Sequence, residues 1–515
     1  MDYKIKIQEL LKDPEKLKRK KPFLRGSNEW SDTYDTNDEI KPNSTIKAKL
    51  SNLKKIQVSQ DTFLAELDPN SHKVIFDENI PSIHQKLSNG SYQEIKSYRT
   101  PIPIQKCIKN KQVMHLAANP MQFTLMDVNP TEKQQRNFIT FKHYWDLRNQ
   151  DGMKYKMVDT QKSVGDAGLL YYFDRAGKIK SRLLSYPEYV LCPHNDDNGD
   201  RILESVWYID DYGVETIDSY DDMYLYRMTN DAVEKDENGN GWRLTLQEEH
   251  GFNEIPLITK RGDVAWNEIQ QLIESYEELY NVFMVIQKRW GWGILYVKGK
   301  FKNEAKKVAG SVVLQDTSME GNGDAKFLTP PTPQGTIDTL NMMLESIQLG
   351  SSTTFILPKD IKMSGDVSGI AVQLTQSQDN ELALQNVIDW QNVADKMVRL
   401  FKYGLAKELV NTKENVNAIT DFEDLKINAK FKVWRPLNDY EYNQMIATLK
   451  SNGILSLESA IELNTLSKPD EKIRIEKETE IAQKKALEIA NANKQNSDNE
   501  NGNKNEDITN KGEEE

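Results

Sequence analysis

Three helical segments, with an irregular stretch between the first two, constrain this chain more than any other feature. Apolar residues recur at helical spacing along residues 266–290, which predicts a long amphipathic helix. Residues 336–350 carry a shorter apolar stripe, and a stretch rich in Gly and Pro, residues 291–335, separates the two. A third helix follows Gly369; with about 40 residues at about 1.5 Å per residue it would be roughly 60 Å long. This order favours a component of a large assembly over an enzyme with a compact pocket.

The region before these helices predicts an α+β fold, with sheet and helices segregated. Helical spacing predicts helices over residues 103–125 and 138–147. Short runs of Leu, Ile, Tyr and Val between turn residues predict antiparallel strands, as follows: 169–172, 179–184, 204–209, and a hairpin of 224–228 with 242–248.

Local signals refine the boundaries of these helices. Asp263 is the expected N-cap of the first helix, and Gly350 is the expected end of the second. In the stretch between them we expect strands at residues 294–298 and 312–315, with a turn at residues 321–324.

The C-terminal region predicts short helical elements and then a tail. Residues 431–434 suit a strand, and the expected helices span residues 439–450, 456–463 and 469–493. Residues 494–515 are acidic and almost without apolar side chains, so we expect disorder there.

Charge and cysteine usage exclude several classes of protein. The formal net charge is −12, which argues against a protein that grips nucleic acid but permits one past which DNA slides. Residues 1–25 are basic and suit either an arm that contacts nucleic acid or an acidic neighbour, or a solvated helix end; we favour the second. Two cysteines, Cys107 and Cys192, do not make a disulfide framework. No apolar run has signal-peptide or membrane-spanning length, so we expect no membrane role.

Motifs for catalysis or metal binding are missing or weak. The P-loop pattern is absent, and Cys192 with His194 lacks the paired spacing of a zinc site. We therefore predict no catalytic residue, no metal and no cofactor. The alternative from another class is a metal-dependent nuclease built on acidic pairs, namely Asp210 with Asp211, Asp221 with Asp222, and Glu248 with Glu249.

Three passages in a fixed order give the chain a family resemblance. They are Phe252-Asn-Glu-Ile-Pro-Leu-Ile leading into residues 267–288, Ser364-Gly-Asp-Val-Ser-Gly-Ile-Ala, and Asn452-Gly-Ile-Leu-Ser-Leu-Glu-Ser-Ala-Ile followed by Pro469-Asp-Glu-Lys-Ile-Arg-Ile-Glu-Lys-Glu. In this order the chain resembles the portal proteins of tailed bacteriophages, in the subgroup of about 500 residues, over roughly residues 100–490.

The resemblance implies a division of the chain into parts. The expected parts are an N-terminal arm and loop (1–70), an α+β wing (71–263), a first stem helix (264–290), a clip (291–335), a second stem helix (336–350), a channel loop (351–368), a long wing helix with a closing strand (369–434), a helical crown (435–493) and the disordered tail (494–515).

The resemblance also implies a function and partners. The protein would form a ring of about twelve subunits at one vertex of the capsid. Double-stranded DNA would pass through the ring during packaging and ejection. The terminase large subunit, the head–tail connector or adaptor and the major capsid protein would be the partners. The chain would be synthesised in the host cytoplasm and end in the virion. In this setting the nuclease alternative would be a virion-associated enzyme. A non-portal minor capsid or scaffold protein built from the same helices is a further alternative.

Site residues follow from the same resemblance. The channel-loop candidates that would face DNA are Lys359, Asp360, Lys362, Met363, Ser364, Gly365 and Asp366. The residues expected on the first stem helix are Trp266, Glu274, Glu277, Tyr280 and Phe283. Without the resemblance, an ordinary connection between helices would be the better interpretation of residues 355–368.

Overall fold

The computed structural model describes most of the chain as helices, strands and short connections. The described residues are 3–18, 23–25, 56–76, 83–86, 91–95, 99–127, 129–196, 198–231, 241–290, 294–298, 324–328, 334–355, 377–434, 439–464, 475, 477–481 and 483–485. They fall into two compact units, one of residues 1–362 with 375–435 and the other of residues 363–374 with 436–515.

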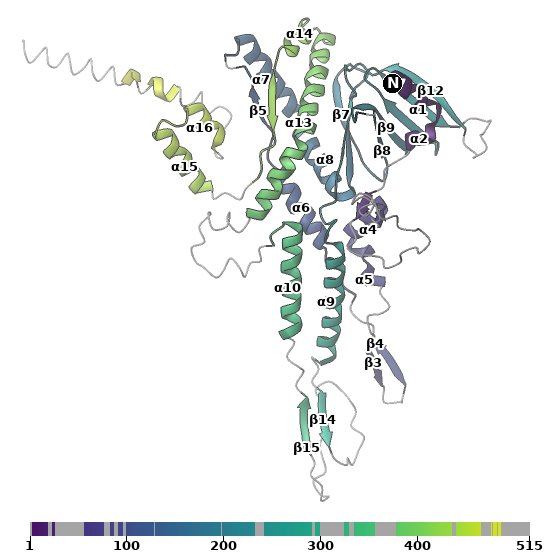
Figure 1. Ribbon diagram of the computed structural model, residues 1–515. Coiled ribbons are helices and arrows are strands. Elements are labelled where there is room, and N and C mark those ends of the chain that lie inside the picture. Colours follow the sequence, from purple (N-terminus) through teal and green to yellow (C-terminus); the bar gives the residue numbers. More distant parts are fainter. Residues whose placement is uncertain are drawn as a thin grey trace, which may run out of the picture. The chain divides into compact units, whose positions relative to one another are not determined.

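The first unit mixes helices with antiparallel sheets, as the α+β prediction required (Figure 1). Its larger sheet has the order β12-β11-β10-β9-β8 and its second sheet the order β13-β6-β7. The strands are β6 (Asp166–Phe173), β7 (Ile179–Leu184), β8 (Val190–Asn195), β9 (Arg201–Ile209), β10 (Glu215–Tyr220), β11 (Tyr224–Asn230), β12 (Trp242–Glu249) and β13 (Leu257–Arg261). The predicted strands of this region and the β11–β12 hairpin are confirmed.

Four helices pack around the second sheet and enclose the main core. They are α6 (Ile104–Ala117), α7 (Glu132–Leu147), α8 (Gln150–Val164) and α13 (Ser377–Asn411). Aromatic rings fill the space between α7 and α13, with the Trp145 and Phe401 centroids 5.3 Å apart. Gly404 permits the close approach of α13 to β7, because a Cβ there would lie 2.2 Å from Cδ1 of Ile179.

The N-terminal residues pack against the larger sheet. Helices α1 (Tyr3–Lys12) and α2 (Pro14–Lys18) place Leu17 in a core cluster with the strands. The Lys18 ammonium lies 5.1 Å from the ring centre of Trp242 and 3.1 Å from the Glu215 carboxylate. Leu17 and Lys18 therefore belong to a docked element, and neither a free basic arm nor a solvated helix end describes them.

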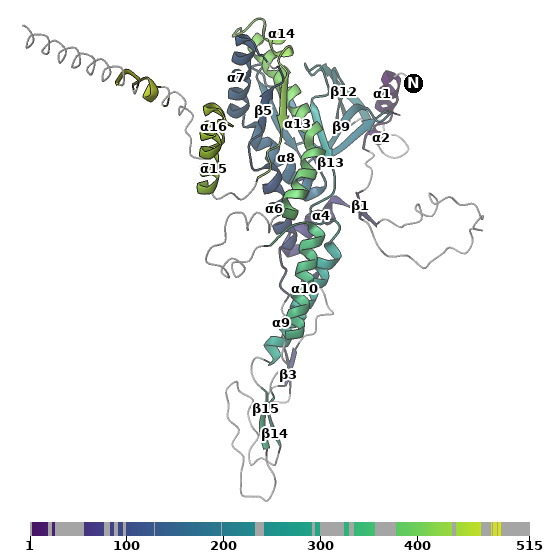
Figure 2. The ribbon, with the colours of Figure 1, turned by 60° about the vertical axis from the view of Figure 1, so that its left-hand side comes forward.

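The first unit also contains a helical hairpin and several short strand pairs. Helices α9 (Gln270–Trp290) and α10 (Gln334–Ser351) lie side by side in both views (Figures 1 and 2). The remaining elements are β1 (Phe23–Arg25), β2 (Ile56–Val58), α4 (Gln60–Leu67), η1 (Pro69–Ser71), α5 (Lys73–Phe76), β3 (Ile83–Lys86), β4 (Tyr92–Ile95), β5 (Gln122–Leu125), β14 (Ile294–Lys298), β15 (Asp324–Leu328), α14 (Ala418–Glu423) and β16 (Ile427–Lys430).

Several predicted boundaries were wrong near this hairpin. The first helix begins at Gln270, so Asp263 is not its N-cap. The second helix continues through Gly350 to Ser351. Strand β14 is confirmed, but its partner is β15, which starts inside the predicted turn. The strand predicted at residues 312–315 lies outside the described residues.

Two further predictions were wrong because tertiary pairing set the limits of the elements. Residues 122–125 form β5 instead of continuing the helix. Strand β5 pairs with β16 at residues 427–430, four residues before the predicted strand. Residues 431–434 follow that strand, and Phe431 reaches the main core.

The second unit contains α15 (Asp439–Ser451) and α16 (Leu457–Leu463). Both confirm the predicted short helices, and Ser456 caps α16 by accepting a hydrogen bond from the Ser459 amide at 3.1 Å. The predicted tail, residues 494–515, and most of the predicted last helix lie outside the described residues.

Candidate functional site

The α9–α10 hairpin is held together by apolar faces at helical spacing. Ile273 on α9 and Ile347 on α10 are fully buried in one core cluster. Gly350 allows the end of α10 to approach the start of α9, because a Cβ there would lie 2.7 Å from Cγ2 of Ile269. The residue at position 350 therefore serves packing between the helices, not helix termination.

A buried ion pair joins α9 to the segment that precedes α5. The Glu277 carboxylate lies 2.7 Å from Nδ1 of His72 and accepts a hydrogen bond from the Ile102 amide at 2.7 Å. The second ring nitrogen of His72 lies 2.9 Å from the Glu66 carbonyl oxygen. Burial lowers the pKa of His72, but the hydrogen bond and charge of Glu277, helped by the Glu66 carbonyl, outweigh it and raise the pKa. The arrangement favours a charged pair in the interior.

Two more buried polar contacts reinforce the same junction. Asn281 accepts from the Thr100 amide at 2.7 Å and donates to the Thr100 carbonyl at 2.9 Å. The indole nitrogen of Trp266 donates to the Glu66 carboxylate at 2.8 Å. The middle of α9 and the residues before it are thereby fixed to segments far away in the sequence.

The predicted stem residues do not share one face or one role. Trp266 precedes α9 and lies in the core, and Glu277 is buried on the helix itself. Glu274 pairs with Lys73 at 2.8 Å. Tyr280 is half-buried and stacks on Tyr276, and Phe283 is half-buried too.

The channel-loop candidates, residues 359–366, lie outside the described residues, but both flanks of this segment are described. Residues 352–355 follow α10, and α13 begins at Ser377. The Asp379 carboxylate accepts from the Thr354 amide at 3.1 Å, so the two flanks are in direct contact.

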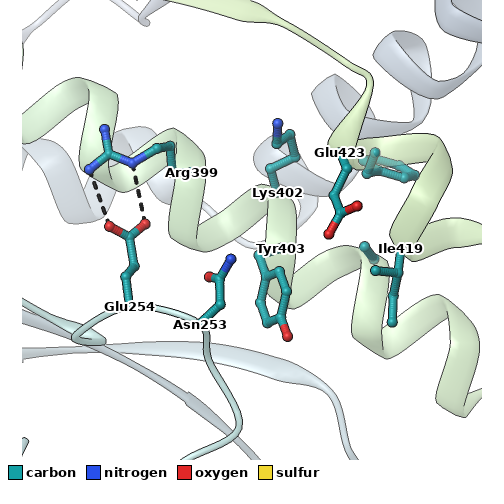
Figure 3. A pocket seen from close by; sticks show the side chains of 9 residues that line it. Asn253, Glu254, Arg399, Lys402, Tyr403, Ile419 and Glu423 are labelled. Carbon is teal, nitrogen blue, oxygen red and sulfur yellow. Dashed lines mark hydrogen bonds and ion pairs between the residues drawn. The ribbon is translucent and has the colours of Figure 1, made fainter. Parts of the chain in front are cut away.

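A cavity in the first unit lies between α13, α14 and the segment before β13 (Figure 3). It has a volume of about 320 Å³. Arg399 donates to both carboxylate oxygens of Glu254 at 3.3 and 3.2 Å at its edge. Lys402 donates to the Leu425 carbonyl at 3.0 Å. Both of these cations that line the cavity are therefore engaged with groups of the chain itself.

The acidic pairs proposed for a nuclease are not assembled into a metal site. Asp221 uses Oδ1 to accept from the Met223 and Tyr224 amides, and its Oδ2 accepts from the Tyr226 hydroxyl at 2.9 Å. Asp210 likewise caps a turn. Within the described ranges no group of three or more His, Cys, Asp or Glu residues could hold a metal ion.

The cysteine–histidine pair considered for zinc is also committed elsewhere. The Cys192 thiol donates to the Lys18 carbonyl at 3.3 Å. Burial lowers the pKa of His194 to about 4. Both residues serve the contact between β8 and the N-terminal helices.

Sequence reasoning missed His72, Lys111 and Asp379. Each is a single polar residue whose partner lies far away in the sequence, and no spacing rule connects such partners. Asp379 carried no local signal either, because the predicted helix follows Gly369, ten residues earlier.

Comparisons with known proteins found a matching family model and similar solved structures. A family model described as phage portal protein, SPP1 Gp6-like, matches residues 46–485. Among solved structures, the chain is similar to a chain in the neck of an empty GTA particle computed with C6 symmetry. The identity is 13%, the alignment covers 71% of this chain and 91% of that chain, and the TM-score is 0.36. No curated protein matches the chain. In the part of the chain that the structure describes, no helix is long and apolar enough to cross a membrane.

Proposed function

The chain belongs to the family of SPP1 Gp6-like phage portal proteins, and on that basis we propose that it forms a closed ring at one vertex of a phage capsid. The ring would be the channel for DNA packaging and ejection. The observation that carries this proposal is the family match over residues 46–485, which includes the wing sheets, the α9–α10 hairpin and the crown helices α15 and α16.

The proposed parts of the ring follow the described elements. Helices α9 and α10 form the stem, and strands β14 and β15 belong to the clip. Residues 359–366 belong to the channel loop, where Lys359 and Lys362 meet DNA phosphates in weak and transient contacts. The activity is structural, because the ring guides DNA and the energy for packaging comes from a partner ATPase.

Exposed apolar side chains on α10 support contacts between copies. Met342 and Leu349 are 66% and 67% exposed and lie seven residues apart, so they share one side of the helix. Apolar surface of this kind favours burial against another protein surface. A head-to-tail contact that closes by rotation would cover this side and produce a ring.

The proposed partners are the terminase large subunit, a head–tail connector and the major capsid protein. The terminase and the connector would dock in turn on the clip, residues 291–335. Double-stranded DNA would pass along the axis, and the assembled protein would be part of the virion.

The mass of the assembled particle tests the proposal. We expect light scattering at micromolar concentration to give about twelve times the chain mass of 59.3 kDa, or a neighbouring multiple. Negative-stain images should show a closed ring with a central hole. A single-chain mass at every concentration would contradict the proposed function.

A further inference from the structure

We propose that Lys111 and Asp379 clamp together the two ends of the segment between α10 and α13, and that this clamp positions the segment in the channel. The clamp consists of contacts of the Lys111 and Asp379 side chains within the first unit. Its role in the channel rests on the proposed function.

One carboxylate joins the two ends of this segment. Asp379, in the first described turn of α13, accepts hydrogen bonds from the Thr354 amide at 3.1 and 3.3 Å, one to each oxygen. Residues 355–378 of the chain lie between these two contact points. The segment therefore leaves and re-enters the fold at the same place.

Lys111 on α6 completes the clamp from a third element. Its ammonium lies 3.2 Å from the Asp379 carboxylate and also donates to the Thr354 carbonyl. The Thr354 amide therefore donates to Asp379, and the Thr354 carbonyl accepts from Lys111. Two successive peptide groups, one on each side of the Thr354 Cα, are therefore held, which leaves this part of the chain little freedom to shift.

Neighbouring side chains hold the residues just before Thr354. Gln112, next to Lys111, donates to the Ser351 carbonyl at 3.1 Å and lies 3.3 Å from the Thr353 hydroxyl. Gln348 accepts from the Phe355 amide at 2.8 Å. The chain reaches this position through Ser352, whose φ of 48° lies in the left-handed region. Such a backbone conformation persists where surrounding contacts enforce it.

A role in helix stability alone does not explain these contacts. An acid in the first turn of a helix commonly stabilises the helix through its own amide groups. Asp379 is buried, and its carboxylate accepts hydrogen bonds from Thr354 and Lys111, which lie outside α13. A connection between elements, rather than a cap, is what the carboxylate supplies.

Hydrogen exchange on the full-length protein tests the clamp directly. We expect Lys111→Met to accelerate exchange of the amides of residues 352–355 by about tenfold or more, because their anchor on α6 is lost. Lys111→Arg should restore slow exchange, since it keeps the charge and the donors. The matched control is Lys133→Met, which removes the 2.6 Å pair with Asp421 on α14 and should leave residues 352–355 unchanged. Unchanged exchange in Lys111→Met would overturn the clamp.

DNA packaging by reconstituted heads tests the positioning role. Rings of Lys111→Met and of Asp379→Asn should assemble but package at least several-fold less DNA, and Lys111→Arg should package as the wild type does. Normal packaging by a variant with fast exchange would overturn the positioning role while the proposed function stands. If the wild-type ring itself fails to package, the proposed function fails and the exchange rates still decide the clamp. A variant that does not assemble is judged by the same exchange measurement on the single chain.

Discussion

At the scale of single residues, the contact between α9 and the segment that precedes α5 depends on a buried charge pair. His72 and Glu277 are almost inaccessible to solvent and 2.7 Å apart. A buried pair of this kind contributes little net stability when complete, but removal of one partner costs about 3–5 kcal/mol because the other charge is left unpaired. Protonation of His72 decides whether the pair exists.

The first prediction concerns the pH dependence of this pair. The pKa of His72 is raised above its ordinary value of 6.5, so the charged pair contributes stability that is complete below about pH 6.5 and is lost as the pH rises through the raised pKa. We expect His72→Gln to lower the melting temperature most below pH 6.5 and to flatten the pH dependence above it. The exposed His143 provides the control, as His143→Gln. Parallel pH curves for wild type and His72→Gln would contradict the prediction.

A second buried acid is destabilising in its charged form. Glu204 lies in the interior, where one carboxylate oxygen accepts from the Thr259 hydroxyl at 2.7 Å. Its other oxygen, Oε2, has no hydrogen-bond partner among the described residues. Burial raises the pKa of Glu204, outweighing the nearby charges of Arg201 and Lys396. The charged form is therefore disfavoured in the folded protein.

The second prediction follows from the raised pKa of Glu204. Because the pKa of Glu204 is raised above 4.5, its contribution to stability is complete below pH 4.5 and is lost as the pH rises through the folded value. We expect Glu204→Gln to stabilise the protein at neutral pH by about 1–3 kcal/mol, the cost of a buried unpaired polar group, and to have little effect near pH 4. Glu215→Gln is the contrasting control, since Glu215 pairs with Lys18 at 3.1 Å and should destabilise when neutralised. Chemical denaturation at both pH values measures the difference.

At the scale of elements, sequence patterns succeed where local signals and packing agree. The strands β6, β7 and β9 alternate with clear turns, so their sequence predicted them well. The pattern failed at β5 and β16, because residues 122–125 continue a helical spacing and become a strand only by pairing with residues 427–430. Tertiary pairing overrode the local preference there.

The candidate site was harder to predict than the fold for the same reason. Trp266 fits the apolar stripe of the following helix, yet its indole bonds with Glu66 before the helix begins. Glu277 is a charged residue, which the sequence alone would assign to the surface. It is buried because it pairs with His72 from another part of the chain. Such pairings depend on contacts between segments about 200 residues apart.

The third prediction concerns the exposed apolar side of α10. We expect Leu349→Glu, alone or with Met342→Glu, to weaken assembly at least tenfold, since a buried unpaired charge in an apolar contact is costly. The fold of the single chain should persist because both side chains are exposed. Leu244→Glu, at an exposed apolar residue on β12, is the matched control and should still assemble. If Leu349→Glu and Leu244→Glu weakened assembly to the same extent, α10 would not be the specific contact between copies.

At the scale of the whole molecule, an acidic chain must guide a polyanion without binding it. The net charge of −12 repels DNA in general, and a channel wall of the same sign would keep DNA from binding to it. A few cations at the narrowest point would then act against a repulsive background. Tight binding at that point would stop translocation, so each contact must be weak and sensitive to salt.

The last prediction tests whether Lys359 and Lys362 of the proposed channel loop make such weak contacts with DNA. We expect Lys359→Glu with Lys362→Glu to leave ring formation intact and to impair DNA packaging or retention, because two charge reversals per subunit are repeated around the ring. The exposed Lys426 and Lys430, reversed together, change the net charge equally and should package normally. Packaging by reconstituted heads, with ring mass measured separately, compares the two double variants. The defect should shrink as salt increases, since screening weakens the added repulsion. Wild-type packaging by the first variant would remove these lysines from any role on DNA and leave the segment between α10 and α13 as a steric element, positioned by its ends alone.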